Sequence, residues 1–367
     1  MKKVNLGIVG CGCISGIYFK NLTTVFNDII NVYACADLIK ERVEKAAQEY
    51  NVPHIMTFEE MLICEDIELI LCITQPCFHY DICKRALLAG KNVYTEKPLS
   101  LEFGQGKELM DIAKEKGLLL GGAPDTFMGA GIQTCRKLID DGYIGDIVGA
   151  TAFMMSKGHE SWHPDPEFYY KAGGGPMFDM GPYYITALIN LMGSVKIVAG
   201  MNNTAFEERT ITSQPHYMEK IRVETPTHVS AMLCFTSGAT ASIITTFDCK
   251  KSDLPLIEIY GTKGSIKVPD PNCFGGPVML ATSDGTGYKE VPLTHIYNEN
   301  SRGLGLADMA LSIRTKDAPR AGCQQNGHVL EIMDAVFRSF KTGRYYKMTT
   351  KYRRMKPMSR DIIKGQI

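Results

Sequence analysis

A lysine that follows a short predicted strand is the residue of this sequence best placed to do chemistry. Lys97 lies in the run Tyr94–Pro98, directly after an apolar strand predicted over Asn92–Thr95. In open α/β sheets, ligands bind in the crevice beyond the carboxyl ends of the strands. Lys97 would therefore contact a bound cofactor and the molecule that reacts with it, although most lysines simply lie in solvent.

A second reactive pair follows the glycines at 173–175. Asp179 and Tyr183 are four residues apart, so one helix through both would present them on the same face. Asp179 would orient the Tyr183 hydroxyl, which exchanges a proton if its ordinary pKa of about 10 is lowered. Lys97 nearby would lower it, and loss of solvent would lower the pKa of Lys97. The alternative is an aspartate cap with buried aromatic side chains. We expect Lys97, Asp179 and Tyr183 to be the catalytic residues.

An aromatic segment just upstream is predicted to form the wall of a substrate site. Aromatic side chains combine an apolar body with polar edges, a combination suited to sugar rings. Packing of a loop onto its domain explains the same segment equally well. His159 and His163 are four residues apart, but no third ligand is spaced to complete a metal site, so no metal is expected. The residues expected to contact substrate are Asp125, Trp162, His163, Tyr169 and Tyr184.

A glycine-rich loop, Gly10-Cys11-Gly12-Cys13-Ile14-Ser15, joins the first predicted strand to a helix. Gly10 permits the tight turn, Gly12 lets the backbone approach a pyrophosphate, and the helix amino terminus supplies N–H groups. Ser15 replaces the third glycine, so the loop alone also fits a plain strand-to-helix turn. Asp37 ends the second strand, where a carboxylate accepts ribose hydroxyls and repels a 2′-phosphate. The sequence therefore predicts NAD as the cofactor.

A second loop, Thr74-Gln75-Pro76, leaves a strand at the same predicted edge. Two roles fit His79 behind it: capping the following helix or contacting nicotinamide. The residues expected to bind the cofactor are Gly10, Gly12, Cys13, Ile14, Asp37, Thr74, Gln75, Pro76, His79, Glu96 and Lys97.

Strands and helices alternate up to about residue 122, which predicts a doubly wound parallel sheet. The expected strands and helices are Val4–Val9, Ser15–Phe26, Ile30–Ala36, Lys40–Tyr50, Thr57–Leu62, Leu69–Ile73, His79–Ala89, Asn92–Thr95, Leu101–Lys116 and Leu118–Gly121.

Beyond Pro124 the pattern changes, and the residues predict a second domain with a mixed or antiparallel sheet. Residues 195–295 are mostly strand, with hairpins at 237–238 and 261–264. The expected helices are Ala130–Asp140, Pro182–Met192, Ala307–Ile313 and Gly327–Lys341. We expect domains at 1–122 and 123–345, followed by a basic tail, 346–367, that is solvated or contacts another subunit.

Composition excludes several classes of partner. The 367 residues contain 40 Lys+Arg and 40 Asp+Glu, so no net charge attracts nucleic acid or anionic lipid. The twelve cysteines show no C-x-x-C pair and are predicted to be reduced and buried. No apolar stretch reaches the ~20 residues needed to cross a bilayer. The sequence indicates a cytoplasmic protein.

Several of these motifs, in this order, resemble the Gfo/Idh/MocA oxidoreductases over roughly residues 3–345. They are Gly10-x-Gly12 with Asp37, Thr74-Gln75-Pro76, Glu96-Lys97-Pro98 and Asp179-x-Gly181-x-Tyr183. The resemblance implies a Rossmann domain and a second α/β domain whose large open sheet makes homo-oligomer contacts. It also implies hydride transfer between nicotinamide carbon 4 and a sugar or cyclitol carbon. Lys97 would contact the substrate hydroxyl and the nicotinamide ribose, and the Lys97–Pro98 bond is a candidate cis peptide.

One departure from the family concerns the proton acceptor. Inositol-dehydrogenase-like members have histidine where this chain has Tyr183, so the acceptor is Tyr183, Lys97 or the neighbouring His163. The residues of segments 162–170 and 179–184 also resemble those of a bacterial subgroup that oxidises the 3-hydroxyl of glycosides. Our hypothesis is an NAD-dependent dehydrogenase of a secondary hydroxyl, at C3, of a sugar or glycoside. The alternatives are an NAD-dependent glycosidase acting by transient oxidation and elimination, and a non-catalytic sugar or NAD sensor.

Overall fold

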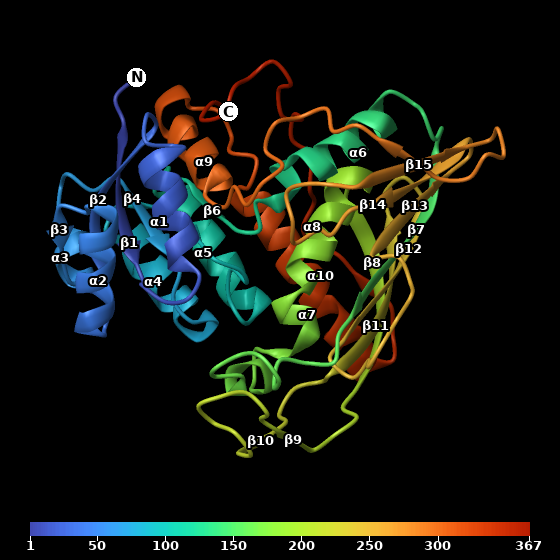
Figure 1. Cartoon of the computed structure of the whole chain (residues 1–367), viewed down its shortest axis with the longest axis horizontal. Helices are drawn as coiled ribbons and strands as arrows, with labels where there is room; N and C mark the ends of the chain where they lie inside the picture. Colours follow the sequence, from blue (N-terminus) through green and yellow to red (C-terminus); the bar gives the residue numbers. More distant parts are fainter.

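Two sheets of different design organise the chain, and the computed structural model describes residues 1–367 (Figure 1). The first sheet has six parallel strands in the order β3-β2-β1-β4-β5-β6. This is the strand order of a doubly wound dinucleotide-binding domain, as predicted. Its strands are β1 (Val4–Val9), β2 (Ile30–Ala36), β3 (His54–Ile55), β4 (Leu69–Cys72), β5 (Asn92–Thr95) and β6 (Leu120–Gly122).

The helices of this first domain match the predicted ones, with shifted ends. The Thr57 hydroxyl accepts the Glu60 N–H while the Glu60 carboxylate accepts the Thr57 N–H, so these two residues form a capping box at the start of the third helix. The fourth helix begins at Pro76 rather than His79, because proline suits a first helical turn. The helices are α1 (Ser15–Thr24), α2 (Lys40–Tyr50), α3 (Phe58–Ile63), α4 (Pro76–Leu88) and α5 (Phe103–Glu115).

The second sheet has nine strands in the order β16-β15-β14-β13-β7-β12-β11-β8-β17. Only the central pair β7–β12 is parallel, so the expected open, mostly antiparallel sheet is confirmed. Its strands are β7 (Ile147–Met155), β8 (Val195–Asn203), β11 (His228–Phe235), β12 (Thr240–Thr246), β13 (Ile257–Gly261), β14 (Gly264–Val268), β15 (Val278–Thr282), β16 (Lys289–Val291) and β17 (Tyr346–Lys347).

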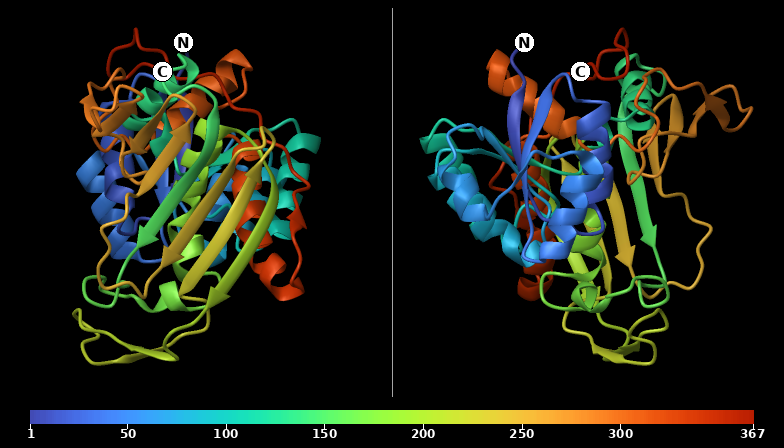
Figure 2. Two further views of the ribbon diagram at one scale, coloured as in Figure 1. Left: turned by 90° about the vertical axis from the view of Figure 1, so that its right-hand side faces the viewer. Right: turned by 60° about the vertical axis from the view of Figure 1, so that its left-hand side comes forward.

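Helices cover one face of the nine-stranded sheet and leave the other face bare (Figure 2). A Cβ on Gly200 would meet the backbone of Val336 at 2.5 Å, so β8 lies directly against the last helix. The remaining helices are η1 (Thr126–Met128), α6 (Ala130–Asp140), η2 (Glu167–Tyr170), α7 (Gly175–Asp179), α8 (Gly181–Met192), α9 (Leu304–Thr315) and α10 (Cys323–Thr342).

A small hairpin that the sequence did not predict lies between β8 and β11 of the second sheet. Between β8 and β11 the chain leaves the sheet and forms a separate two-stranded hairpin, β9 (Glu208–Thr210) and β10 (Lys220–Arg222). The hairpin lies beyond the ends of the large strands, beside the loop that follows β7 (Figures 1 and 2).

Part of the basic tail packs against its own chain, so the segment is not simply solvated. β17 pairs with β8, and Tyr352 and Met358 are buried. The Tyr352 hydroxyl contacts Asn190 Oδ1 at 3.0 Å and Gln325 Oε1 at 3.2 Å. Tyr352 and Met358 therefore belong to the folded core, while the charged residues around them are mostly exposed. The structure contains no helix long and apolar enough to cross a membrane, and all twelve cysteines are free.

Loss of the buried ring should destabilise the protein far more than loss of a neighbouring charge. We expect Tyr352→Ala to lower the free energy of unfolding by about 3–5 kcal/mol, as for other buried aromatic truncations. The matched control is Arg353→Ala, because Arg353 is exposed beside it. Urea unfolding followed by circular dichroism measures both, and equal midpoints would contradict a packed tail.

Candidate active site

The predicted nucleotide loop lies at the carboxyl edge of the parallel sheet, as expected. Gly10 has φ +108°, and a Cβ there would come within 2.8 Å of the Ile73 carbonyl oxygen, so the turn requires glycine. A Cβ on Gly12 would meet nothing within 4 Å, which leaves open space in front of the loop. Cys13 and Ile14 are exposed there, and no side chain caps the amino terminus of α1. The Ser15 N–H donates to the Gly12 carbonyl oxygen at 3.1 Å, and the other N–H groups of the first helical turn, which have no side-chain cap, can bind a phosphate.

Asp37 holds the nucleotide loop at the end of β2. Its Oδ2 accepts the Cys11 N–H at 2.6 Å, and its Oδ1 accepts the Ile39 N–H at 2.8 Å. Each carboxylate oxygen can accept a further hydrogen bond, as ribose hydroxyls require. The residues present therefore fit an adenosine ribose at this position.

The loop after β4 lies at the same edge, but His79 does not face it. Its Nδ1 is 2.8 Å from the Pro98 carbonyl oxygen and its Nε2 is 3.1 Å from the Thr74 carbonyl oxygen, and the side chain is 0% exposed. His79 therefore neither contacts a cofactor nor caps the helix. Its two ring nitrogens instead connect the loop at Thr74 to the loop at Pro98. Thr74, Gln75 and Pro76 are accessible at the start of α4, and the Lys97–Pro98 bond is cis, as the family resemblance implied.

Glu96 orients Lys97 and does not project toward a cofactor. Its Oε2 accepts the Lys97 backbone N–H at 3.0 Å, and its Oε1 accepts the Tyr18 hydroxyl from α1 at 2.7 Å. Burial of the carboxylate is tolerated because both oxygens are hydrogen-bonded. The strand that ends in Lys97 is thereby tied to the first helix.

Lys97 bridges to the second domain through Asp179. Its Nζ donates to Asp179 Oδ1 at 2.8 Å and to the Asp179 carbonyl oxygen at 2.7 Å. Sequence spacing had suggested a single helix through Asp179 and Tyr183, which is wrong: α7 ends at Asp179 and α8 begins at Gly181. Pro182 has no N–H to continue the helix, and the Tyr183 N–H bonds the Met180 carbonyl instead. The Asp179 carbonyl is therefore free for Lys97.

His159 completes this group, and the sequence analysis missed that role. Its Nε2 lies 3.0 Å from Asp179 Oδ2. Since an ionised carboxylate only accepts, Nε2 carries the proton in this contact. Its Nδ1 is buried with no partner in the protein. The four-residue spacing between His159 and His163 drew attention to this histidine, but we considered the two only as possible metal ligands. No group of three or more His, Cys, Asp and Glu side chains is arranged to hold a metal ion.

Electrostatics keep Lys97 charged and Asp179 ionised. Burial opposes both charges, but Asp179, Tyr183 and Glu96 together raise the pKa of Lys97 above its usual value. Lys97 and His159 likewise overcome burial and lower the pKa of Asp179 to about 2. The expectation of a lowered pKa for Lys97 is therefore wrong, because a carboxylate replaces the lost solvent.

Tyr183 lies under the ammonium group of Lys97, whose Nζ is 5.3 Å from the ring centroid. Burial raises the pKa of Tyr183, and the opposing effects of Lys97 and Arg302 do not outweigh it. The predicted lowering of this pKa is wrong in direction. Arg302, which the sequence did not indicate, is held beside the phenol by hydrogen bonds to Asn272 and Asn300.

The aromatic residues form a cluster around His159. The Tyr169 ring is 3.9 Å from the His159 ring, and the Trp162 ring is 5.3 Å from it. Trp162 is 60% exposed and is available to a ligand. His163 does not reach Asp179 by any hydrogen bond; its Nδ1 accepts the Asp165 N–H, and burial lowers its pKa.

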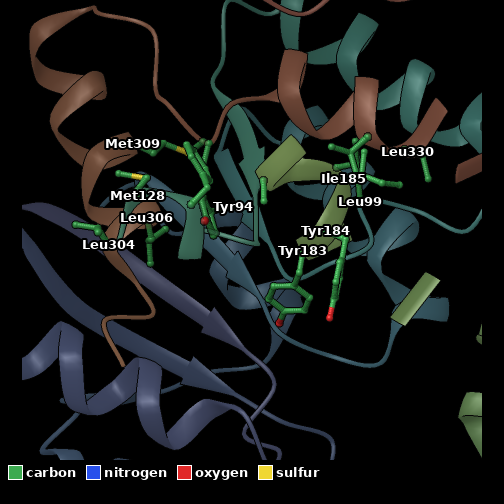
Figure 3. Close-up of a cluster of buried hydrophobic side chains, with 14 of the residues drawn as sticks. Tyr94, Leu99, Met128, Tyr183, Tyr184, Ile185, Leu304, Leu306, Met309 and Leu330 are labelled. Carbon is green, nitrogen blue, oxygen red and sulfur yellow. The ribbon is translucent and has the colours of Figure 1, made fainter. Parts of the chain in front are cut away.

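Two residues predicted to contact substrate are structural. Asp125 is 1% exposed, and its Oδ2 accepts the N–H groups of Gly303 and Gly305, which secures the start of α9. Tyr184 is 2% exposed and lies beside Tyr183 among buried hydrophobic side chains (Figure 3). Neither belongs to an open substrate wall, because both side chains are almost completely buried.

Fold and site together define a protein with a dinucleotide-binding fold in its first domain and a polar cluster where the second domain meets it. The family model described as "Oxidoreductase family, NAD-binding Rossmann fold" matches residues 4–122. The model described as "GFO/IDH/MocA C-terminal domain" matches residues 132–267. Together they cover more than half of the chain, which belongs to the Gfo/Idh/MocA family.

Similarity to individual proteins is more distant. Inositol 2-dehydrogenase of Rhizobium meliloti is 24% identical over 79% of this chain and 82% of its own length. An uncharacterised oxidoreductase of Schizosaccharomyces pombe is 27% identical, but the match spans only about half of each chain, 53%. A levoglucosan dehydrogenase solved with NADH and L-sorbose has a TM-score of 0.81 at 21% identity, covering 95% of this chain and 99% of its own. An NAD-binding oxidoreductase of Klebsiella pneumoniae gives 0.81 at 19%, covering 95% and 100%.

The position of Asp37 predicts how the protein distinguishes the two nicotinamide dinucleotides. We expect Asp37→Ala to weaken NADH binding about tenfold, equal to about 1.4 kcal/mol, and to reduce the discrimination against NADPH. Titration of NADH and NADPH, followed by cofactor fluorescence, measures both affinities. Asp28→Ala removes an exposed carboxylate elsewhere in the same domain and serves as the control. Unchanged selectivity in Asp37→Ala would contradict the assignment.

Proposed function

We propose that the protein is an NAD-dependent dehydrogenase that oxidises a secondary hydroxyl of a sugar or glycoside. The observation that carries this proposal is the Lys97–Asp179–His159 chain. It spans the two domains at the carboxyl edge of the parallel sheet, with Tyr183 beneath the ammonium group. The third donor of the Lys97 ammonium group, together with the Tyr183 hydroxyl, favours catalysis over a sensor without catalysis, because proton transfer needs such groups and ligand binding alone does not.

NAD supplies the hydride acceptor when it is bound. The residues that would hold it are Gly10, Gly12, Cys13 and Ile14 at the pyrophosphate, Asp37 at the adenosine ribose, and Thr74, Gln75 and Pro76 nearer the nicotinamide. The open space at Gly12 and the uncapped start of α1 support this assignment. The carboxylate of Asp37 favours NAD over NADP.

The chain's own residues would bind the reacting hydroxyl and receive its proton. Lys97 donates two hydrogen bonds to Asp179, and an ammonium group has a third donor for a substrate oxygen. Lys97 and Tyr183 are both protonated at neutral pH because both pKa values are raised. One of them must lose its proton before it can accept the hydroxyl proton. Asp179 and His159 hold Lys97 in position for that exchange.

A carbohydrate is the substrate class that the surroundings favour. Trp162 and Tyr169 offer aromatic faces beside His159. Among the relatives, one is an inositol 2-dehydrogenase, and a levoglucosan dehydrogenase was solved with NADH and levoglucosan. The resemblance of segments 162–170 and 179–184 to glycoside 3-oxidising proteins supports C3 of a glycoside as the oxidised carbon.

The bare face of the nine-stranded sheet supports a homo-oligomer. Met232 on β11 and Met201 on β8 are exposed on this face, which carries no helix. Apolar side chains gathered on an uncovered sheet favour contact with a second copy. Neither the site nor the net charge calls for nucleic acid or a membrane as a partner.

Incubation with NAD and a panel of free sugars, methyl glycosides and cyclitols tests the function. We expect NADH absorbance with at least one member and a product lighter by two hydrogens. Lys97→Ala should lower kcat by about 10² or more, because proton transfer by a positioned group contributes at least that factor. Lys84→Ala, on the surface of α4, is the control.

Mass spectrometry separates this proposal from the glycosidase alternative. Release of the aglycone without net NADH would favour cleavage through transient oxidation. Near-normal turnover in Lys97→Ala would contradict the role given to this lysine.

The raised pKa values predict an alkaline dependence for oxidation. Below the raised pKa of Lys97 or Tyr183 the required base is scarce, so the wild-type kcat/KM for oxidation should rise about tenfold per pH unit from neutrality up to pH 10 without levelling off. Asp179→Asn removes the carboxylate that raises the pKa of Lys97, so its curve should level off at lower pH. Initial rates from pH 6 to pH 10 measure both curves. A wild-type profile that is flat above pH 7 would exclude both residues as the acceptor.

A further inference from the structure

We propose that Arg209 is a positioning residue that fastens the hairpin β9–β10 onto the substrate loop, residues 158–170, and so holds His159 against Asp179. The catalytic consequence rests on the proposed function. The hairpin would then be a specificity element of the site, although it touches neither the nucleotide loop nor Lys97.

Arg209 occupies the centre of a buried polar group. The residue is 7% exposed, and its guanidinium group donates to Glu160 Oε1 at 2.7 Å from the substrate loop. It also forms an ion pair with Asp248 and donates to the Phe247 carbonyl oxygen at 3.2 Å, just beyond β12. The guanidinium group lies over the Tyr170 ring at 5.2 Å. One side chain thus joins the hairpin, the substrate loop and the end of the large sheet.

The contacts lead from Arg209 to His159 in two short steps. Glu160, held by Arg209, accepts the Tyr170 hydroxyl at 2.6 Å. The same hydroxyl oxygen accepts the His159 backbone N–H at 3.2 Å. His159 then reaches Asp179 through Nε2. The backbone position of His159 therefore depends on a hydroxyl whose own position depends on Arg209.

The backbone of the hairpin is tied to the same loop independently. The N–H groups of Thr212 and Ser213 donate to the Glu160 carbonyl oxygen at 2.8 and 2.9 Å, and the Ser213 hydroxyl donates to the His163 carbonyl oxygen. Gly158 has φ +96°, and a Cβ there would lie 2.4 Å from the Tyr170 hydroxyl and 2.2 Å from Glu160 Oε2. The loop has no room for a larger residue at this point.

The contacts of Arg209 fix the position of the substrate loop rather than add to the stability of the fold. Buried ion pairs can often be replaced by apolar side chains without loss of stability, whereas their directed hydrogen bonds fix one arrangement. Arg209 supplies a rigid planar fork that engages Glu160 and Asp248 in a fixed geometry, whereas a lysine ammonium group is a point charge without that fork. The substrate loop contains no helix longer than η2, so it needs such an external support.

Trp162 makes the inference testable, because it is the only tryptophan of the chain and lies on the substrate loop. The test variants are Arg209→Met and Gly158→Ala, which disturb the same contacts from opposite sides. The control is Lys220→Met, which breaks an exposed ion pair with Glu208 on the same hairpin. Full-length proteins are compared by time-resolved tryptophan anisotropy, NADH titration and steady-state kinetics with the glycoside found in the panel.

We expect both test variants to at least double the amplitude of the fast tryptophan anisotropy decay and to lower kcat/KM at least tenfold. NADH affinity should stay within twofold of the wild type, because the contacts do not reach the nucleotide loop. Lys220→Met should match the wild type in every measurement. Gly158→Ala keeps all the charges, so it carries the test if Arg209→Met does not fold.

Unchanged Trp162 dynamics in a folded test variant would overturn the proposal, as would a kcat/KM within twofold of the wild type. A loss of NADH affinity equal to the loss of kcat/KM would also overturn it, since that pattern indicates general damage. If the wild type oxidises no member of the panel, the proposed function fails, while the anisotropy comparison still decides whether Arg209 holds the loop.

Discussion

The ion pair between Lys97 and Asp179 is the interaction on which the rest of the site depends. It joins the end of β5 in the first domain to the end of α7 in the second, at 2.8 Å. A buried charge is tolerated only when it is paired and hydrogen-bonded, so each partner needs further support. Glu96 supplies it for the Lys97 backbone, and His159 supplies it for the second oxygen of Asp179. The two domains therefore build one shared polar site rather than two adjacent surfaces.

Around this pair, the fold separates two tasks. The parallel sheet gathers loops at its carboxyl edge by topology alone, and these loops fit a dinucleotide. The second domain adds residues from distant positions: His159 follows β7, Asp179 ends α7 and Arg302 precedes α9. The hairpin β9–β10 stands outside both sheets and acts through the substrate loop. Substrate preference can then change by altering the loop and the hairpin while the nucleotide edge stays constant.

Features set by neighbours along the chain could be predicted from the sequence, and features set by distant contacts could not. The capping box at Thr57, the turn at Gly10 and most strands of the two sheets follow from local patterns. The short edge strands β3 and β17 were not predicted. The role of His159 depends on Asp179, a partner that spacing alone does not reveal. The pKa directions of Lys97 and Tyr183 depend on how burial balances against several charges. Asp125 and Tyr184 are polar enough to suggest a site, and only tertiary packing shows that they are buried.

The break between α7 and α8 has a consequence for engineering this protein. A continuous helix over residues 175–192 would satisfy more backbone hydrogen bonds, and replacement of Pro182 by a strong helix former would promote it. In such a helix the Tyr183 N–H would take the Asp179 carbonyl oxygen, which now accepts Lys97. Selection for thermal stability alone would thus tend to produce a continuous helix. Lys97 would then lose its hydrogen bond to the Asp179 carbonyl oxygen and keep only the one to the carboxylate. At Met180 a more regular helix would therefore hold Lys97 less firmly than the irregular backbone does.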